Sequence, residues 1–303
     1  MTCVACGASA ARPLYEVRGF SIVQCTCGLA RTALPEGFDP AAIYSEAYFQ
    51  GGMHDGYADY ASSAEDLRRE FRVVVGELAR HIGGRGGRGG GDGGGGRDGR
   101  DARLIEIGSA YGFFLDVARE QFTVCGVEIS DAARAAAVAR GHDVVRELTP
   151  AFVDARGPFD AAVMLDVVEH MQDPGAAFAE LHRAMRPGAR LVLTTGDFGS
   201  AIARVMGKRW RLMTPPQHLW FFSPATIRAL LARHGFRVEA IDHPWKRVPL
   251  ALMAYQAARY LGGQALVRNL PIRGALPVNL FDAMRVTAVR AGRAARAVRA
   301  GRE

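Results

Sequence analysis

Four cysteines near the N-terminus have a spacing that suits metal binding. They form two pairs, Cys3-x-x-Cys6 and Cys25-x-Cys27, and a glycine follows the second cysteine of each pair. Four thiolates suit tetrahedral zinc, and a site closed by four protein ligands has no open position for catalysis. The segment between the pairs is short, so a small two-stranded ribbon here would need the metal to fold. The alternative is that the cysteines are reduced and bind no metal.

A second group of residues places an acid on each side of a turn that contains two glycines. The run from Leu104 to Ile107 is long enough for a buried parallel strand, and Gly108 to Gly112 can form a sharp turn into a helix. The next apolar run ends at Glu128, whose carboxylate can accept hydrogen bonds from both hydroxyls of a ribose. Strand, turn, helix, strand and acid together make half of a nucleotide-binding α/β fold.

This turn does not suit a dinucleotide with phosphate groups. Ala110 takes the second glycine position of the G-x-G-x-x-G pattern, and Phe113 takes the third. Glu106 would repel a phosphate but attract the cation of an amino-acid moiety, while the N-terminus of the following helix favours a carboxylate. A ligand with an ammonium, a sulfonium and a ribose but no phosphate fits better, which indicates S-adenosylmethionine (SAM).

Three segments in the right order resemble the class I SAM-dependent methyltransferases. They are EIGSAYG (106–112), FDAAVMLDVVEHMQDP (159–174) and LHRAMRPGARLVLTTGD (181–197). The resemblance covers Phe71 to Arg290 and departs from the family at Ala110, where the middle glycine of the turn is expected. It implies an α/β, Rossmann-like sheet that is mostly parallel, has an antiparallel last strand and is flanked by helices. The alternative is an α/β domain that has lost its ligand.

The residues and the resemblance together give the cofactor-binding candidates. Asp166 and Val167 follow the fourth strand, outside the carboxyl end of which ligands of open α/β sheets bind. Glu147 and Leu148 follow the third strand, where residues of the family contact adenine. The full set of candidates is Glu106, Gly108, Ser109, Ala110, Tyr111, Gly112, Phe113, Glu128, Ile129, Glu147, Leu148, Asp166 and Val167.

Two histidines are candidates for a catalytic base. His218 lies in PPQHLWFFSP, which resembles the P-x-x-H-x-x-x-F-S segment of many small-molecule methyltransferases. An imidazole there could take a hydroxyl proton, with a rate that rises with pH through about 6.5. His170 is the weaker candidate, because the matching histidine of the family usually belongs to the framework of the site. The alternative for His218 is a residue that only orders its loop.

Composition and patterning divide the chain into unlike parts. It has 303 residues, a hydrophobic share of 49% and a net charge of +7, much of it from arginines near the C-terminus. We expect a zinc-ribbon-like module at 1–34, a helical cap or connector at 35–82, a disordered Gly/Arg linker at 83–100, a SAM-binding domain at 101–291 with a helical insertion at about 248–275, and a basic tail at 292–303. The cysteines are clustered, and the sequence has neither an apolar run long enough to span a membrane nor a signal-peptide pattern. We therefore expect the protein in the cytoplasm.

Several functions remain open on the sequence alone. A zinc ribbon before such a domain resembles the sugar methyltransferases of antibiotic and glycan pathways, so we expect O-methylation of a small or carrier-bound acceptor, a sugar, glycan or natural-product intermediate. C-methylation of an activated sugar is the near alternative. An RNA-binding protein or RNA methyltransferase would use the Gly/Arg linker and the basic tail, but the linker has no aromatic residue to stack on a base. A non-catalytic zinc module is a third class. The tail could also contact an anionic membrane surface.

Overall fold

The computed structural model describes residues 2–38, 43, 64–83, 101–250, 253–254, 258 and 274–292. The expected aromatic cap before residue 64, the Gly/Arg linker from residue 84 and the basic tail from residue 293 lie outside this part of the chain, as does most of the expected helix between Leu250 and Leu270. Among the helices of the described residues, none is both long and apolar enough to cross a membrane.

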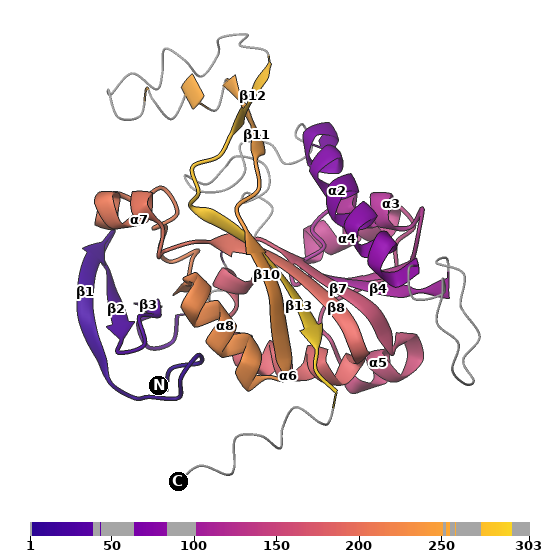
Figure 1. Ribbon diagram of the computed structural model, residues 1–303, viewed down its shortest axis with the longest axis horizontal. Coiled ribbons are helices and arrows are strands. Elements are labelled where there is room, and N and C mark those ends of the chain that lie inside the picture. Colours follow the sequence, from indigo (N-terminus) through magenta and orange to yellow (C-terminus); the bar gives the residue numbers. More distant parts are fainter. Residues whose placement is uncertain are drawn as a thin grey trace.

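A seven-stranded sheet forms the centre of the molecule (Figure 1). Its strands are β4 (Arg103–Ile107), β5 (Thr123–Val127), β6 (Val144–Val145), β7 (Phe159–Leu165), β8 (Met185–Gly196), β10 (Phe236–Asp242) and β13 (Ala283–Arg290), in the order β10-β13-β8-β7-β4-β5-β6. Only β13 runs antiparallel to its neighbours, β8 and β10. The expected fold, a mostly parallel Rossmann-like sheet with an antiparallel last strand, is confirmed.

Helices cover both faces of this sheet. The helices α2 (Ala64–Gly83), α3 (Phe113–Ala118) and α4 (Asp131–Ala139) pack on one face through a core that includes Leu78, Phe114 and Val163. The helices α5 (Pro150–Arg156), α6 (Pro174–Ala184) and α8 (Pro224–Arg233) belong to the other face, where Phe178 and Leu230 lie in a second core cluster. The sheet is therefore held between two apolar layers.

Short polar side chains begin three of these helices, at residue types that favour a helix N-terminus. Ser130 accepts a hydrogen bond from Ala133 N, Asp173 accepts one from Ala176 N, and Ser223 forms a capping box with Thr226. These caps satisfy N–H groups that a helix leaves unpaired at its start. Pro187 and Gly188, a pair that the sequence alone suggests as a turn before the strand, instead lie inside β8 at an irregularity of its pairing with β7.

The N-terminal ribbon shares its sheet with a distant part of the chain. Its strands are β1 (Ala11–Val17), β2 (Phe20–Cys25) and β3 (Ala30–Ala33), and the two-residue strand β9 (Trp220–Phe221) adds to the edge of β3. The sequence predicts only a small two-stranded ribbon here. Because β9 belongs to the loop after β8, the ribbon lies beside α7 (Ala201–Met206) and α8 (Figure 1).

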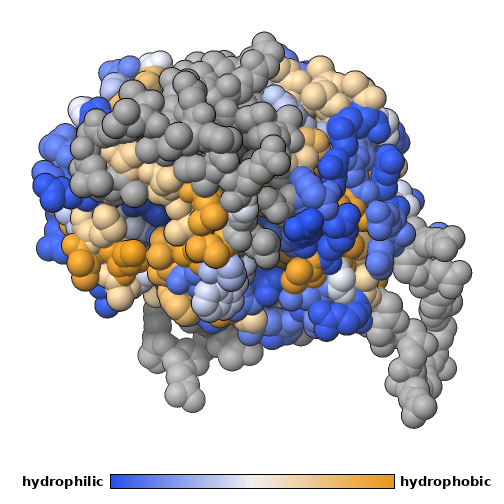
Figure 2. All heavy atoms as spheres, turned by 90° about the horizontal axis from the view of Figure 1, so that it is seen from above, coloured by the Kyte–Doolittle hydropathy of each residue, from blue (hydrophilic) through white to orange (hydrophobic). Residues whose placement is uncertain are grey.

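Two further strands rise above the carboxyl edge of the main sheet. Strand β11 (Lys246–Pro249) pairs antiparallel with β12 (Ala275–Val278), and the pair projects beyond β10 and β13 (Figure 1). Trp245, Leu276, Leu280 and Phe281, at or near its base, have between 44% and 66% of their surface exposed. The face seen from above carries hydrophobic side chains beside a strongly hydrophilic area (Figure 2).

Candidate active site and candidate metal site

The turn after β4 has the left-handed backbone that its glycines predict. Gly108 has φ +76° and Gly112 has φ +78°, and Ala110 between them also has a positive φ of 44°. The alanine at the middle glycine position therefore does not prevent the turn from forming. The N–H groups of Gly108 and Ser109 donate to the carbonyl of Val127, so the turn is fastened to the tip of β5.

Both glycines are needed for packing within the protein. A Cβ at Gly108 would lie 2.5 Å from Val167 Cγ2, and one at Gly112 would lie 2.7 Å from His142 Cδ2. The space beside each glycine is thus occupied by a side chain of this chain. The turn after β4 therefore packs closely against the segment after β7 at Gly108.

Glu128 lies in the position expected for a ribose-binding acid. It is buried just after β5, with Oε2 accepting from Ala110 N at 2.8 Å and Oε1 accepting from Ser130 N at 2.7 Å. Burial raises the pKa of this carboxyl, and the hydrogen bonds from Ser130 and Ala110 oppose that rise. Each oxygen keeps a lone pair beyond its backbone bond, so the carboxylate can still accept from a ligand hydroxyl.

Glu106 is the second acid of this region and lies inside β4. It is 4% exposed, and its Oε2 has no hydrogen-bond partner among the described residues. Burial, with a smaller contribution from the charge of Glu128, raises the pKa of Glu106 well above its ordinary value. A buried carboxyl without a partner is costly, and a cationic group of a ligand would supply one. The observed environment fits the ammonium of SAM.

The other cofactor candidates range from buried to exposed. Phe113 is buried, with the guanidinium carbons of Arg68 and Arg140 each 5.0 Å from the centre of its ring, so its side chain belongs to the core. By contrast, Ile129 is 45% exposed just past β5, and Glu147 is exposed past β6. Ser109 is buried, while Tyr111 and Leu148 are partly buried.

The carboxyl end of β7 is joined to β8 by side-chain hydrogen bonds. Asp166 has φ +55°, and its Oδ1 accepts from Thr194 Oγ1 at 2.8 Å, while its N–H donates to the same hydroxyl oxygen at 2.9 Å. Val167 fills the space beside Gly108. The structure thus brings the segment after β7 against the turn after β4, as a site at the carboxyl edge of the sheet requires.

The two candidate histidines lie against each other. Their ring centres are 4.7 Å apart at an interplanar angle of 75°. His218 Nδ1 is 2.7 Å from the carbonyl of Leu212, and His170 Nδ1 is 2.8 Å from the carbonyl of Gln217. Since a carbonyl only accepts, each Nδ1 is the protonated nitrogen, and in the neutral ring each Nε2 is the nitrogen that can accept a proton.

The environment of His218 changes the expected pH dependence. Burial, with the neighbouring His170 as the next cause, lowers the pKa of His218 to about 3, and burial also lowers the pKa of His170. The sequence prediction of a titration near the ordinary imidazole value does not fit this environment. His218 is neutral across the usual assay range, as a proton acceptor must be.

Glu169, which the sequence analysis passed over, belongs to the same group of side chains. Its carboxylate, His170 and His218 have potential ligand atoms that all lie within 4.8 Å of one another. Two imidazole nitrogens and a carboxylate can hold a divalent cation as well as accept a proton. The residue directly precedes His170 in the E-H pair of the sequence, which is the signal that could have identified it.

Asp197 and His243 form another polar contact at this edge. Asp197 Oδ2 is 3.0 Å from His243 Nε2, and its Oδ1 accepts from Gly199 N. Nearby, the buried Asp282 accepts hydrogen bonds from Trp210 Nε1 and from the Arg211 guanidinium. These bonds hold the loop after β8. In the sequence, Asp282 ends the segment Asn279-Leu280-Phe281-Asp282, but the sequence does not show that Trp210 and Arg211 are its partners.

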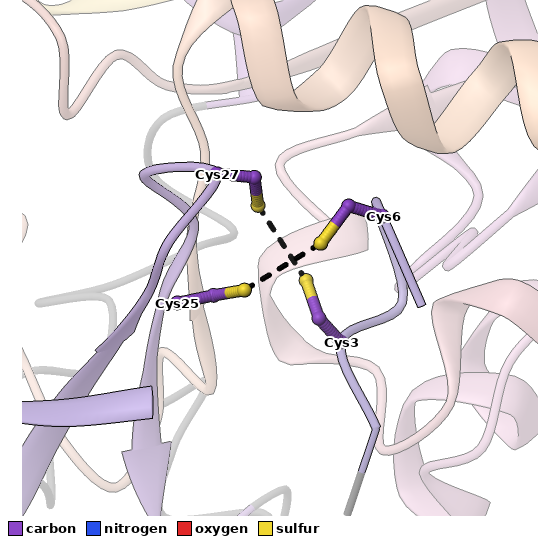
Figure 3. A group of neighbouring side chains, drawn as sticks. All are labelled: Cys3, Cys6, Cys25 and Cys27. Carbon is purple, nitrogen blue, oxygen red and sulfur yellow. Dashed lines mark hydrogen bonds between the residues drawn. The ribbon is translucent and has the colours of Figure 1, made fainter. Parts of the chain in front are cut away.

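The four N-terminal cysteines converge on one point (Figure 3). Cys3 Sγ lies 3.6 Å from Cys27 Sγ, Cys6 Sγ lies 3.5 Å from Cys25 Sγ, and all four sulfurs lie within 4.8 Å of one another. Zn–S bonds of about 2.3 Å in a tetrahedron separate the sulfurs by about 3.8 Å, so this donor set fits zinc. Gly7 and Gly28 have positive φ angles of 79° and 93°, which shows why a glycine follows each pair.

Known proteins are similar to this chain mainly over its central part. Residues 93–241 match the family model described as "Methyltransferase domain". A ubiquinone biosynthesis O-methyltransferase from Caulobacter sp. (strain K31) is 30% identical over 146 residues, which is 43% of this chain and 57% of that protein. One from Xylella fastidiosa (strain 9a5c) is 24% identical over 164 residues, covering 48% and 66% of the two proteins.

A solved structure covers more of the chain at lower identity. It is the magnesium protoporphyrin IX methyltransferase from Synechocystis PCC 6803 with bound SAH, which is 15% identical, covers 82% of this chain and 99% of that one, and has a TM-score of 0.49. The chain spans 57% to 66% of the length of the two sequence relatives. The residues that match the family model, 93–241, include the turn, Glu128 and the segment after β7.

Proposed function

We propose that this chain is a SAM-dependent methyltransferase. The observation that carries the proposal is the position of Glu128, a buried acid at the tip of β5 that accepts from Ala110 N of the turn. Its carboxylate would hold the ribose hydroxyls, and Glu106 would face the ammonium. The match of residues 93–241 to a methyltransferase-domain family supports the same activity. SAM supplies the activated methyl group, so this chain mainly has to position the acceptor and exclude water.

The acceptor is proposed to be a hydroxyl of a small molecule. The neutral Nε2 of His218 can accept a hydroxyl proton, and His170 beside it is the second candidate. The O-methyltransferase names of the sequence relatives support oxygen as the acceptor atom. A sugar, glycan or natural-product hydroxyl, free or carrier-linked, stays the proposed substrate class, with C-methylation of an activated sugar as the alternative.

The cysteine cluster is proposed to hold a structural zinc ion. The residues Cys3, Cys6, Cys25 and Cys27 supply four sulfurs at the spacing that tetrahedral zinc requires. With four thiolates the ion would have no open position, so its contribution is to hold the two loops together.

SAM titration by calorimetry tests the proposed activity. The wild-type chain should bind SAM, and Glu128→Ala should weaken binding about 30- to 150-fold, equivalent to about 2–3 kcal/mol for lost charged hydrogen bonds. Glu120→Ala is the matched control, because Glu120 is an exposed acid just beyond α3. Wild-type protein that fails to bind SAM, or equal affinity in the two variants, would contradict the assignment.

A further inference from the structure

The loop that carries His218 is bonded directly to the N-terminal ribbon. Thr32, in β3, donates from Oγ1 to the carbonyl of His218 at 2.7 Å and from its backbone N–H to the carbonyl of Leu219 at 2.9 Å. The two residues before Thr32, Ala30 and Arg31, pair with Phe221 and Trp220 of β9. Thr32 is 4% exposed, so water cannot readily replace these bonds.

The same loop is fastened on its other side to the segment after β7. Leu219 N–H donates to the carbonyl of Glu169 at 2.7 Å, and Trp220 Nε1 donates to the carbonyl of Met171 at 2.7 Å. His170 reaches the loop as well, through the carbonyl of Gln217. The loop is therefore held between the ribbon and the main domain. Its His218 ring contacts the ring of His170 in the segment after β7.

The cysteine cluster is next to this arrangement in the chain and in space. Cys25 is the last residue of β2 and Cys27 lies in the turn before β3, where Cys25 N–H donates to the carbonyl of Leu29 at 2.9 Å. Ala5 and Leu29 are 2% exposed and lie in the same core cluster as Leu219 and Trp220. A change in the geometry of the cysteine loops would thus be transmitted to β3 and to Thr32.

We propose that Thr32 is a positioning residue for His218, and that the four-cysteine ribbon is in this way part of the acceptor side of the site. The inference rests on the proposed function for the role of His218, but the contact itself can be tested without an acceptor. Thr32 fixes the carbonyl of His218 and, through it, the direction of the imidazole. Loss of its hydroxyl would leave that buried carbonyl with one bond fewer, and the loop would shift. A displacement of about 1 Å can cost about 100-fold in rate.

The test compares variants of the full-length protein by ¹⁵N NMR of the imidazole nitrogens. Thr32→Val has nearly the same shape as threonine but lacks the hydroxyl, whereas Thr32→Ser keeps it. Ser21→Ala is the matched control, since the hydroxyl of Ser21 belongs to the same ribbon and donates to Glu16 within it. The His218 resonances are assigned by their loss in His218→Gln, and Thr32→Ala provides a second hydroxyl-free variant if the valine variant does not fold.

The hydroxyl-free variants should shift or broaden the His218 resonances, while Thr32→Ser and Ser21→Ala leave them in place. SAM affinity, measured by calorimetry, should stay within about twofold of wild type in all of them, because the bonds of Thr32 to His218 and Leu219 hold the loop after β8 and not the turn after β4. Unchanged His218 resonances in a folded hydroxyl-free variant would overturn the proposal. So would resonances displaced equally in Thr32→Ser. A wild-type chain that fails to bind SAM would refute the proposed function. The comparison of His218 resonances among the variants would still test the contact with Thr32.

Discussion

Glu128 Oε2 accepts a 2.8 Å hydrogen bond from the backbone N–H of Ala110, so one carboxylate joins the turn after β4 to the tip of β5. The other carboxylate oxygen accepts from Ser130 N, so the same side chain also contacts the residue that begins α4. The acid proposed to bind the ribose is also a structural element of its own site.

Replacing this acid should therefore reduce stability as well as SAM affinity. Glu128→Gln removes one acceptor oxygen and should lower the free energy of unfolding by about 1–3 kcal/mol, the cost of an unsatisfied buried N–H group. Urea unfolding of wild type, Glu128→Gln and the exposed control Glu120→Gln measures it. A loss of SAM affinity with no loss of stability would show that the two bonds do little in the free protein.

The packing of Gly108 against Val167 predicts a compensating pair of substitutions. Gly108→Ala should destabilise the protein by about 1–3 kcal/mol, because its Cβ would lie 2.5 Å from Val167 Cγ2 and the residue has φ +76°. Adding Val167→Ala should recover part of the loss, since the methyl groups in conflict are gone. Additive losses in urea unfolding of the single and double variants would contradict the contact.

Glu106 should make stability depend on pH in a definite direction. Its pKa is raised above 4.5 in the folded chain, so the folded chain holds a proton that the unfolded chain releases. Stability should then fall as pH rises from 4.5 towards the folded-state pKa. Glu106→Gln, which stays neutral, should flatten this decline in urea unfolding and weaken SAM binding. Glu128, whose pKa is also raised, should leave a smaller decline in the variant. An unchanged slope would show that Glu106 is ionised in the folded chain.

The lowered pKa of His218 should make stability change with pH in the opposite direction, at acid pH. Its pKa is lowered from 6.5 to about 3, so the unfolded chain gains a proton before the folded chain does. Stability should fall as pH drops from 6.5 towards 3, and His218→Asn should reduce that fall in acid unfolding experiments.

The same variant tests the role of His218 in methyl transfer. If His218 is the base, His218→Asn should lower the methylation rate about 10²–10⁴-fold with SAM affinity unchanged. The wild-type rate should show no titration near about 6.5, because the neutral ring persists below that value. Near-wild-type turnover in His218→Asn would make His218 a positioning residue and His170 the next base candidate. Turnover that requires an added divalent cation while the cysteine cluster keeps its zinc would instead favour a cation held by Glu169 and the two histidines.

Metal analysis tests the cysteine cluster. The purified chain should contain about one zinc ion, and replacing both Cys25 and Cys27 by serine should remove it. Cys125→Ala is the control, since Cys125 lies in the main core and not in the cluster. Because Cys27 lies in the turn that leads into β3, which pairs with β9, metal loss should also increase amide exchange in β9 while the central strands stay protected. Zinc retained at one per chain in the double variant would place the ligands elsewhere.

Local chemistry made much of the main fold predictable. Ser130, Asp173 and Ser223 start helices because their short side chains bond nearby N–H groups, and apolar runs mark the buried strands. The same reasoning identified Glu106, Glu128, His170 and His218 as candidates but not Glu169.

The remaining features depend on contacts between distant residues, which a single sequence does not contain. Strand β9 has only two residues, too few for a periodic pattern, and exists because β3 lies beside it. Likewise, the low pKa of His218 comes from burial and from His170, neither of which shows in PPQHLWFFSP. The β11–β12 pair was missed because its strands lie on either side of a segment that favours a helix.

The bond between Thr32 and His218 joins residues 186 positions apart. During synthesis the chain grows from the N-terminus, so the ribbon emerges long before the strand that completes its sheet. Until then the edge of β3 has unpaired N–H and C=O groups, and Leu29 has no core to enter. Early metal binding would keep this nascent ribbon compact while the main domain is still being made, and the ribbon would then dock as one of the last steps of folding.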